Sequence, residues 1–292
     1  VHTHEPGDYD EEIRALGGKI YHISSIGQVS LLRYIKEFKK ALANMQSIDI
    51  IHIHMDWQSG YIALAARLAG IKKVIVHSHT NGINNPTIAK RLAAACSKVL
   101  IQVCAGEKLA CSADAAYWLF GYKKAHIIRN AIDITHYIQL NEVSRLNVRQ
   151  MLQIQPEEIL LCHVGSFSEN KNQLFLIELI KRLNQQDKRY KLILIGRGDT
   201  YFSQVSQAIV TLNLQNDVKL LGVKDNVPEY LNASDIFLFP SKREGFGMVA
   251  VEAQAAGLYC IVSESIPTAV DIGLKLVQYA NISNMDEWQD LI

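Results

Sequence analysis

The chain has 292 residues, of which 49% are hydrophobic and 20% charged, and its formal net charge is +1 at pH 7. This length can bury a large core and predicts two domains, and no uncharged apolar run is long enough to span a bilayer. Five cysteines without paired-ligand spacing argue against a disulfide scaffold and a cysteine-based zinc site. The first residues, VHTHEPGDYDEE, lack the pattern of a signal peptide, so we expect a soluble cytoplasmic protein that binds no nucleic acid.

The first half of the chain alternates between β-branched apolar runs and helical patterns. Residues 97–106, SKVLIQVCAG, have the composition of a strand, but the helix before them could continue, and we interpret them as helix. The alternation predicts a parallel sheet covered by helices. The expected strands are 19–23, 48–55, 72–78, 108–112 and 125–129, and the expected helices lie near 31–45, 60–69, 87–95 and 113–120.

A polar segment, 141–158, contains a proline and predicts a linker before the alternation restarts. We therefore expect two Rossmann-like, doubly wound α/β domains, 1–152 and 153–292, with the first lacking its first strand. Two such domains usually hold their ligand in the cleft between them, at the carboxyl ends of the strands. In the second domain the expected strands are 159–165, 191–196, 217–222, 235–240 and 259–263, and the expected helices are 172–186, 201–214 and 248–257.

Charge is distributed unequally, with a net charge of +6 over residues 1–155 and −5 over residues 156–292. In the segment LLRYIKEFKKAL, apolar residues line one helical face while Arg33, Lys36 and Lys40 lie away from it. We interpret these cations as the solvated face of a surface helix. The alternative is peripheral contact with the anionic inner face of a membrane.

The segment SKREGFGMVAVEAQAAGLYC, residues 241–260, places Glu244 and Glu252 on either side of a Gly-Phe-Gly. An apolar strand precedes it, and a helix is expected to begin near Gly247 or Met248. The glycines permit close backbone approach, and the free N–H groups of a helix N-terminus suit an anion. This loop is therefore predicted to hold a diphosphate.

Glu252 is expected in the second turn of that helix, on the face that packs against the sheet with Val249, Ala253 and Ala256. A carboxylate there is costly unless something satisfies it, and the two hydroxyls of a ribose would do so. Glu244, at the mouth of the loop, is placed to accept sugar hydroxyls. Taken alone, Glu252 could equally be a glutamate that the helix dipole favours near a helix N-terminus, and Glu244 a charged residue of a surface loop. The position of the pair after an apolar strand favours a nucleotide-sugar site.

At these residues the chain resembles the retaining, GT-B fold glycosyltransferases of family 4, especially the branch that builds bacterial exopolysaccharide and capsule. The resemblance covers nearly the whole chain and includes IDIIHIHMDWQSGYIALAARLAGIKKVIVHSHTN, CHVGSFSENKNQLFLIELI and VKLLGVKDNVPEYLNASDIFLFPSKREGFGMVAVEAQAAGL. It implies that Glu252 binds the ribose and that Glu244 lies near the donor sugar. The phosphates would then meet the helix end, formed by Gly245, Phe246, Gly247 and Met248.

The segment VGSFSENKN departs from the family pattern at one position. The family usually has Gly-Arg-Phe followed by a lysine, and both cations hold the diphosphate. Gly165 and Lys171 match, whereas Ser166 replaces the arginine, and losing such a charge-assisted contact costs about 1.5 to 3 kcal/mol. The cations available to replace it are Arg197, Lys242 and Arg243.

Further roles follow from the resemblance. His79, in VIVHSHTNG, would lie at the cleft wall near the donor sugar, and His77 would be structural. Two histidines at alternate positions can bind a metal, but without Asp or Cys partners at ligand spacing we expect no metal site. Gly196 and Arg197 would form the edge of the nucleotide pocket, with Val223 near the base.

The resemblance implies a transfer with retention. The leaving phosphate would take the acceptor proton, while Lys171 and the helix end stabilise the diphosphate, so that no metal cofactor is required. Glu244, Lys171 and His79 are the expected catalytic residues. The expected partners are a nucleotide sugar, with UDP as its carrier, and a glycan or lipid-linked acceptor.

Alternatives of other kinds remain. An epimerase acting on the nucleotide sugar would turn over without an acceptor, and a binding protein with impaired catalysis is favoured by Ser166 but disfavoured by the glutamate pair. An NAD-dependent enzyme is set aside because no G-x-G-x-x-G follows a strand. Against the family pattern, the chain begins near the end of the second strand and stops before the closing helices, which predicts a fragment trimmed at both ends.

Overall fold

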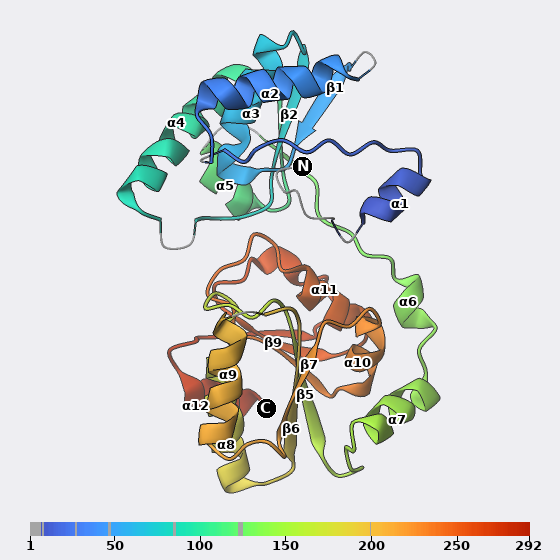
Figure 1. Ribbon diagram of the computed structural model, residues 1–292. Helices are drawn as coiled ribbons and strands as arrows, with labels where there is room; N and C mark the ends of the chain where they lie inside the picture. The colour runs from blue at the N-terminus through green and yellow to red at the C-terminus, as the bar shows by residue number, and fades with distance from the viewer. Residues whose placement is uncertain are drawn as a thin grey trace. The chain divides into compact units, whose positions relative to one another are not determined.

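The computed structural model describes residues 7, 9–26, 28–45, 48–83, 86–121, 125–198 and 200–292. The chain forms two compact units, Val1–Arg129 and Asn130–Ile292 (Figure 1). The division falls before the boundary at residue 152 that the sequence predicts. The predicted linker contains helix α7 (Glu142–Met151), which packs against α10 (Val227–Ala233) and so belongs to the second unit.

The first unit contains a four-stranded parallel sheet in the order β1-β2-β3-β4. As in the sequence prediction, its strands alternate with helices. The strands are β1 (Ile50–Ile53), β2 (Lys73–Ser78), β3 (Glu107–Ala110) and β4 (His126–Ile127). The helices are α1 (Asp10–Ala15), α2 (Leu31–Ala43), the 3-10 helix η1 (Asp56–Gln58), α3 (Ser59–Leu68), α4 (Ile88–Cys104) and α5 (Ala113–Phe120).

Two local predictions in this unit have opposite outcomes. Helix α4 continues through the ambiguous segment, confirming the helical interpretation, because Ala94, Ser97, Ile101 and Cys104 recur at helical spacing and are all buried. Residues 19–23, predicted as a strand, form none, and their side chains are only partly buried. None of the helices in the described residues is long and apolar enough to cross a membrane.

The second unit is a doubly wound parallel sheet in the order β10-β9-β8-β5-β6-β7. Its strands are β5 (Ile159–Val164), β6 (Tyr190–Ile195), β7 (Val218–Gly222), β8 (Ile236–Phe239), β9 (Tyr259–Ser263) and β10 (Val277–Ala280). Besides α7 and α10, its helices are α6 (Thr135–Ile138), α8 (Gln173–Gln186), α9 (Thr200–Thr211), α11 (Met248–Ala255), η2 (Thr268–Val270) and α12 (Met285–Leu291).

The core of this unit explains its elements. Central strands such as β5 are near-continuous apolar runs because helices cover both faces of a parallel sheet. The sequence analysis did not assign β10, α10 or α12. Trp288 of α12 is nevertheless fully buried, and its ring centroid lies 5.1 Å from that of Phe175 of α8. The order of strands reverses between β5 and β8, so the two neighbours begin opposite halves of the sheet.

Asp235, the residue before β8, fastens α7 to the sheet. Its carboxylate accepts hydrogen bonds from Arg145 and Arg149 of α7 and, at 2.7 Å, from the N–H of Leu160 in β5. Arg149 is buried and also donates to the carbonyl oxygens of neighbouring loops. This network explains why a polar helix, read from sequence as a linker, is part of the fold.

Replacing Asp235 by Asn should lower the free energy of unfolding by about 2 to 4 kcal/mol, because two guanidinium groups lose their counter-charge in a partly buried place. Urea unfolding followed by circular dichroism measures this. The matched control is Asp187→Asn, whose ion pair with Arg189 is half exposed and should contribute under about 1 kcal/mol. Equal losses in the two variants would contradict the role given to Asp235.

Candidate functional site

The loops that follow β5 and β8 meet at the reversal of strand order. Parallel strands on either side of such a reversal open a crevice at their carboxyl ends, where ligands of this fold class bind. The two loops are joined by hydrogen bonds from Lys242 N to Asn170 O (2.7 Å), from Asn170 Nδ2 to Arg243 O (2.8 Å) and from Asn172 Nδ2 to Pro240 O (3.3 Å).

Lys171 and Glu244, two predicted site residues, form an ion pair across these loops. Lys171 Nζ lies 2.7 Å from Glu244 Oε1, and the side chains are only 19% and 16% exposed. The ammonium group also lies 4.8 Å from the centre of the Phe239 ring, at the end of β8. The structure therefore brings together a cation and a carboxylate that are 73 residues apart in the sequence.

A buried histidine holds the first of these loops in place. His163 lies in β5, an inner strand of the sheet, and donates from Nδ1 to the Leu238 carbonyl of β8 at 2.9 Å. Gln173 donates through its amide to His163 Nε2 and to Ser166 O, and its carbonyl accepts from Ser168 N. Both imidazole nitrogens of His163 are thus satisfied, and the loop backbone is tied to the sheet.

Sequence reasoning missed His163 and Gln173. The available signal is a histidine inside the apolar run ILLCHVG, where an ionisable side chain needs a partner. Burial, together with the nearby charge of Lys171, lowers the pKa of His163 to about 4. His163 is therefore neutral at pH 7, as its two hydrogen bonds require.

Glycine contacts bring the loop after β6 to the same edge. A Cβ on Gly196 would overlap the carbonyl oxygen of Gly165, so this crossing admits only glycine. Phe167 N donates to Arg197 O at 2.7 Å, which places the Arg197 backbone beside the residue that follows Ser166. The side chains of Ser166, Arg197 and Val223, the last following β7, are exposed at this edge.

Helix α11 begins at the end of the β8 loop. Gly247 has a φ of +96°, and a Cβ there would lie 3.1 Å from the Phe239 ring, so the tight entry to the helix favours glycine. No side chain in the described part of the chain caps this end. Among the described residues, no acceptor is found for the N–H groups of Met248 and Val249. Phe246 and Gly245 are buried, and the amides of Met248 and Val249 are those that a helix N-terminus offers to an anion.

Glu252 lies on a half-buried side of α11. The prediction that it faces the sheet is wrong, since the buried face consists of Ala250, Val251, Ala253 and Gln254. Its carboxylate has no hydrogen-bond or ion-pair partner in the described part of the chain, and burial raises its pKa. Tyr137 of α6, which the sequence analysis did not name, lies near it: burial and then the charge of Glu252 raise the pKa of Tyr137 to about 12.

In the first unit, His79 follows β2 and is held by two contacts. Its Nε2 lies 2.7 Å from Nδ1 of His54, and its backbone N–H donates to Asp56 Oδ1 at 2.8 Å. His77 is buried in β2, and burial and the neighbouring imidazoles lower its pKa to about 4. The placement of His79 near a donor sugar stays a prediction.

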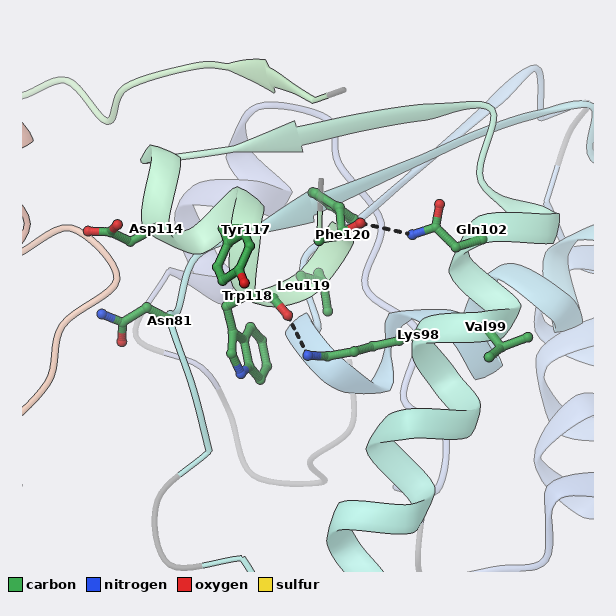
Figure 2. Close-up of a pocket in the computed structure, with 10 residues that line it drawn as sticks. Asn81, Lys98, Val99, Gln102, Asp114, Tyr117, Trp118, Leu119 and Phe120 are labelled. Carbon is green, nitrogen blue, oxygen red and sulfur yellow. Dashed lines mark hydrogen bonds between the residues drawn. The ribbon is translucent and has the colours of Figure 1, made fainter. Parts of the chain in front are cut away.

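The first unit also contains a cavity of about 720 Å³ between α4 and α5 (Figure 2). Lys98 extends from α4, donates to the Trp118 carbonyl and lies 4.6 Å from the centre of the indole ring. Burial lowers the pKa of Lys98. The other lining residues are Asn81, Val99, Gln102, Asp114, Tyr117, Leu119, Phe120 and Gly121.

Together these features define an α/β protein with two parallel-sheet units, in which the loops after β5 and β8 meet at the reversal of strand order, where ligands of this fold class bind. Residues 144–275 match the family described as Glycosyl transferases group 1. The chain is 34% identical over 299 residues to the protein named "Putative glycosyltransferase EpsF" of Bacillus subtilis (strain 168), covering 100% of this chain and 77% of that protein. The chain belongs to the glycosyl transferases group 1 family and is a glycosyltransferase.

Other relatives and solved structures agree. The capsular polysaccharide biosynthesis glycosyltransferase CapH of Staphylococcus aureus is 28% identical, over 89% of this chain and 70% of that protein. HepE of Anabaena in complex with UDP superposes with a TM-score of 0.80 at 19% identity, covering 98% of this chain and 79% of that one. A glycosyltransferase of Rickettsia africae gives a TM-score of 0.74 at 17% identity, over 98% and 76%. These structures confirm the predicted fold class, GT-B.

The buried His163 predicts a pH dependence of stability. Because its pKa falls from the ordinary 6.5 to about 4 on folding, the unfolded chain binds a proton more readily. Neutral His163 contributes about 3 kcal/mol to the free energy of unfolding. This contribution is complete above pH 6.5 and is lost as the pH falls toward 4.

The measurement compares urea unfolding of the wild type with His163→Gln from pH 7.5 to 4. The difference between the two curves should shrink as the pH falls, since glutamine does not titrate. The variant His126→Gln, at an exposed histidine, should follow the wild type in parallel. A constant difference between wild type and His163→Gln would show that His163 titrates normally in the folded protein.

Proposed function

We propose that the chain transfers a hexose from a UDP-sugar to a lipid-linked or glycan acceptor, with retention, in the synthesis of a surface polysaccharide. The observation that carries this is the Lys171–Glu244 ion pair at the reversal of strand order, next to the uncapped end of α11. The names of CapH and of an Escherichia coli UDP-Gal:alpha-D-GlcNAc-diphosphoundecaprenol alpha-1,3-galactosyltransferase, 27% identical over 80% of this chain, support the substrate classes. The latter relative is covered over 61% of its length.

The donor is proposed to bind in three parts. Lys171 and the free N–H groups at Met248 and Val249 take the diphosphate, which supplies the acceptors that these donors lack. Glu252 accepts the ribose hydroxyls and thereby gains the hydrogen bonds missing from its half-buried carboxylate. Glu244, released from Lys171 as the ammonium group turns to the phosphate, accepts hydroxyls of the sugar.

Because Ser166 stands where the family usually has an arginine, another residue must supply that cationic contact to the diphosphate. The hydrogen bond from Phe167 N to Arg197 O joins the β6 loop to the residue after Ser166. We assign the replacement of the missing guanidinium to Arg197 on this basis. Gly196 completes the same edge of the pocket, with Val223 near the base.

The chemical step needs charge stabilisation more than a protein base. As the bond from the anomeric carbon to phosphate breaks, negative charge grows on the diphosphate, and Lys171 with the helix amides stabilises it. The departing phosphate oxygen takes the proton of the attacking hydroxyl. These groups supply the stabilisation without a metal cofactor.

The acceptor is assigned to the first unit. The cavity beside Lys98 offers the rings of Tyr117 and Trp118 for packing against sugar faces, with Asp114 and Asn81 as polar partners (Figure 2). A location at the cytoplasmic face of a membrane fits a lipid-linked acceptor, with the cations of α2 facing anionic lipid. Family membership favours transfer over the epimerase and over an impaired binding protein.

Calorimetric titration with UDP, GDP and ADP tests the donor assignment. UDP should bind, and Glu252→Gln should weaken it at least about tenfold, because the ribose loses a charged acceptor. Glu178→Gln, an exposed change on α8, should bind UDP like the wild type. Stability at pH 7 should not fall in Glu252→Gln, since burial already disfavours the charged carboxyl. If UDP bound the wild type and Glu252→Gln equally, the ribose role of Glu252 would be wrong.

Replacing Lys171 by Ala should lower kcat by about a hundredfold or more, because the leaving diphosphate loses its fixed cation. The rate is measured as UDP release with a diphosphate-lipid acceptor, and donor affinity is measured separately by calorimetry. Lys181→Ala, at a partly exposed lysine of the following helix that pairs with Glu178, is the matched control and should leave kcat unchanged. Unchanged turnover in Lys171→Ala with intact donor binding would remove Lys171 from this role.

A further inference from the structure

Four histidines gather at the carboxyl edge of the sheet in the first unit. His52 and His54 lie two residues apart at the end of β1, and His77 and His79 lie two apart at the end of β2. Residues 53 and 76 are paired in the parallel register, so the next residues along, His54 and His77, lie side by side. Alternate residues of a strand share a face, which brings His52 to the same group.

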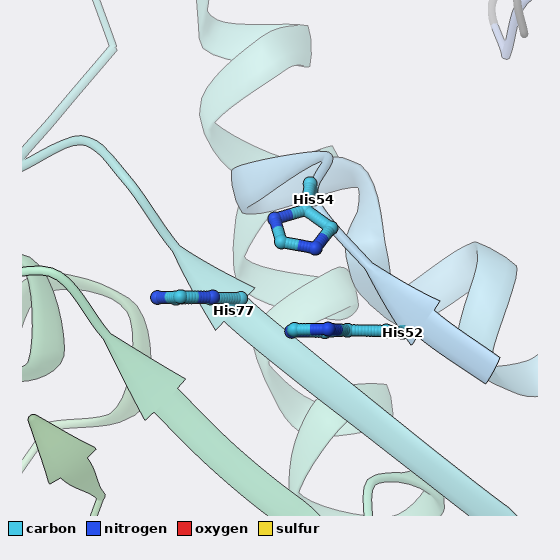
Figure 3. Close-up of side chains that lie close together, drawn as sticks. All are labelled: His52, His54 and His77. Carbon is cyan, nitrogen blue, oxygen red and sulfur yellow. The ribbon is translucent and has the colours of Figure 1, made fainter. Parts of the chain in front are cut away.

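Three of these histidines, His52, His54 and His77, lie close together (Figure 3). The His52 and His77 rings are parallel within 1°, with centroids 5.4 Å apart, and the His54 ring centroid lies 4.0 Å from that of His52. One nitrogen from each ring can be chosen so that all three lie within 4.8 Å of one another. A tetrahedral zinc ion with Zn–N bonds of about 2.0 Å needs its nitrogens about 3.3 Å apart, so the three rings would have to move closer together to bind one.

His77 supplies independent evidence for a ligand. Its side chain is buried, with the residue 6% exposed, yet neither ring nitrogen has a hydrogen-bond partner among the described residues. A buried imidazole without partners is costly, and such groups in folded proteins normally bond to protein, water or an ion. His163 shows the contrast, because both of its nitrogens are bonded.

We propose that His52, His54 and His77 bind a zinc ion through one imidazole nitrogen each, leaving the fourth position to water or another ligand. His52 and His54 are exposed and provide the entry path, while His77 is the buried end of the site. The sequence analysis expected no metal because it considered only His77 and His79. The register of β1 and β2 adds the two remaining histidines, which are distant in sequence.

His79 and Asp56 orient the ligands. Nδ1 of His54 is engaged with His79 Nε2 at 2.7 Å, so Nε2 of His54 is left for the ion. Asp56 Oδ1 accepts the N–H groups of His79 and Thr80, at 2.8 and 3.2 Å, and fixes the turn after β2. Metal-binding histidines usually engage their second nitrogen in this way, which fixes the ring and its tautomer.

Untagged, chelator-treated protein is titrated with Co²⁺ by absorbance and with Zn²⁺ by calorimetry at pH 7. One equivalent of each should bind, Co²⁺ should give the intense visible bands of a tetrahedral site, and Zn²⁺ should bleach them. Bound Zn²⁺ should also raise the Tm. His52→Gln, at an exposed residue, should weaken binding at least about tenfold. His77→Phe, which keeps an aromatic ring but has no ring nitrogen, should abolish it.

The matched control is His126→Gln, an exposed histidine of the same unit that lies 3.8 Å from Glu107, and it should bind Zn²⁺ like the wild type. If His77→Phe does not fold, His52→Gln and His54→Gln decide the question. No saturable binding to folded wild type overturns the proposal. Binding that persists unchanged in both His52→Gln and His54→Gln also overturns it, since the metal would then be held elsewhere.

Discussion

The reversal of strand order between β5 and β8 is the constraint on which the second unit depends. Crossover connections leave these two strands toward opposite halves of the sheet, so their carboxyl-end loops face each other. His163 bonds β5 to β8 beneath the loops, and Asp235 bonds α7 to the opposite ends of the same strands. These two polar contacts, at opposite ends of β5 and β8, fix the spacing of the two strands and of the loops that follow them.

Buried and partly buried polar groups in this chain are of two kinds, which differ in their partners. His163 and Asp235 have their hydrogen bonds completed by the protein, and their contribution is to stability. Glu252 and His77 have none completed within the described residues. Keeping such groups lowers stability, since each loses hydration without a replacement bond. A ligand that supplies the missing hydrogen bond removes this cost, and the recovered free energy increases its affinity. Groups without a partner are therefore better markers of binding sites than fully bonded ones.

Hydrophobic periodicity predicted most strands and helices, because parallel strands and their covering helices have distinct apolar patterns. It failed at α7, because this polar helix is held to the sheet by Arg145 and Arg149. Both donate to the carboxylate of Asp235, which is up to 90 residues away in the sequence. Glu244 was predicted from its position in the loop after an apolar strand and Lys171 from the family resemblance, whereas their direct contact is visible only in the fold. The gathering of histidines depends on strand register, which no local pattern in the sequence specifies.

The contact between Lys171 and Glu244 has a consequence for the order of events at the proposed donor site. A partly buried ion pair is worth little net free energy, because desolvation offsets most of its attraction. A diphosphate carries more charge than one carboxylate and meets the helix amides at the same time, so it can displace Glu244 from the lysine. Glu244 then becomes an acceptor only after the diphosphate is engaged. In this proposal the carboxylate that binds the sugar becomes available only when the diphosphate binds Lys171. A free sugar without a diphosphate would therefore meet a Glu244 that is still paired with Lys171.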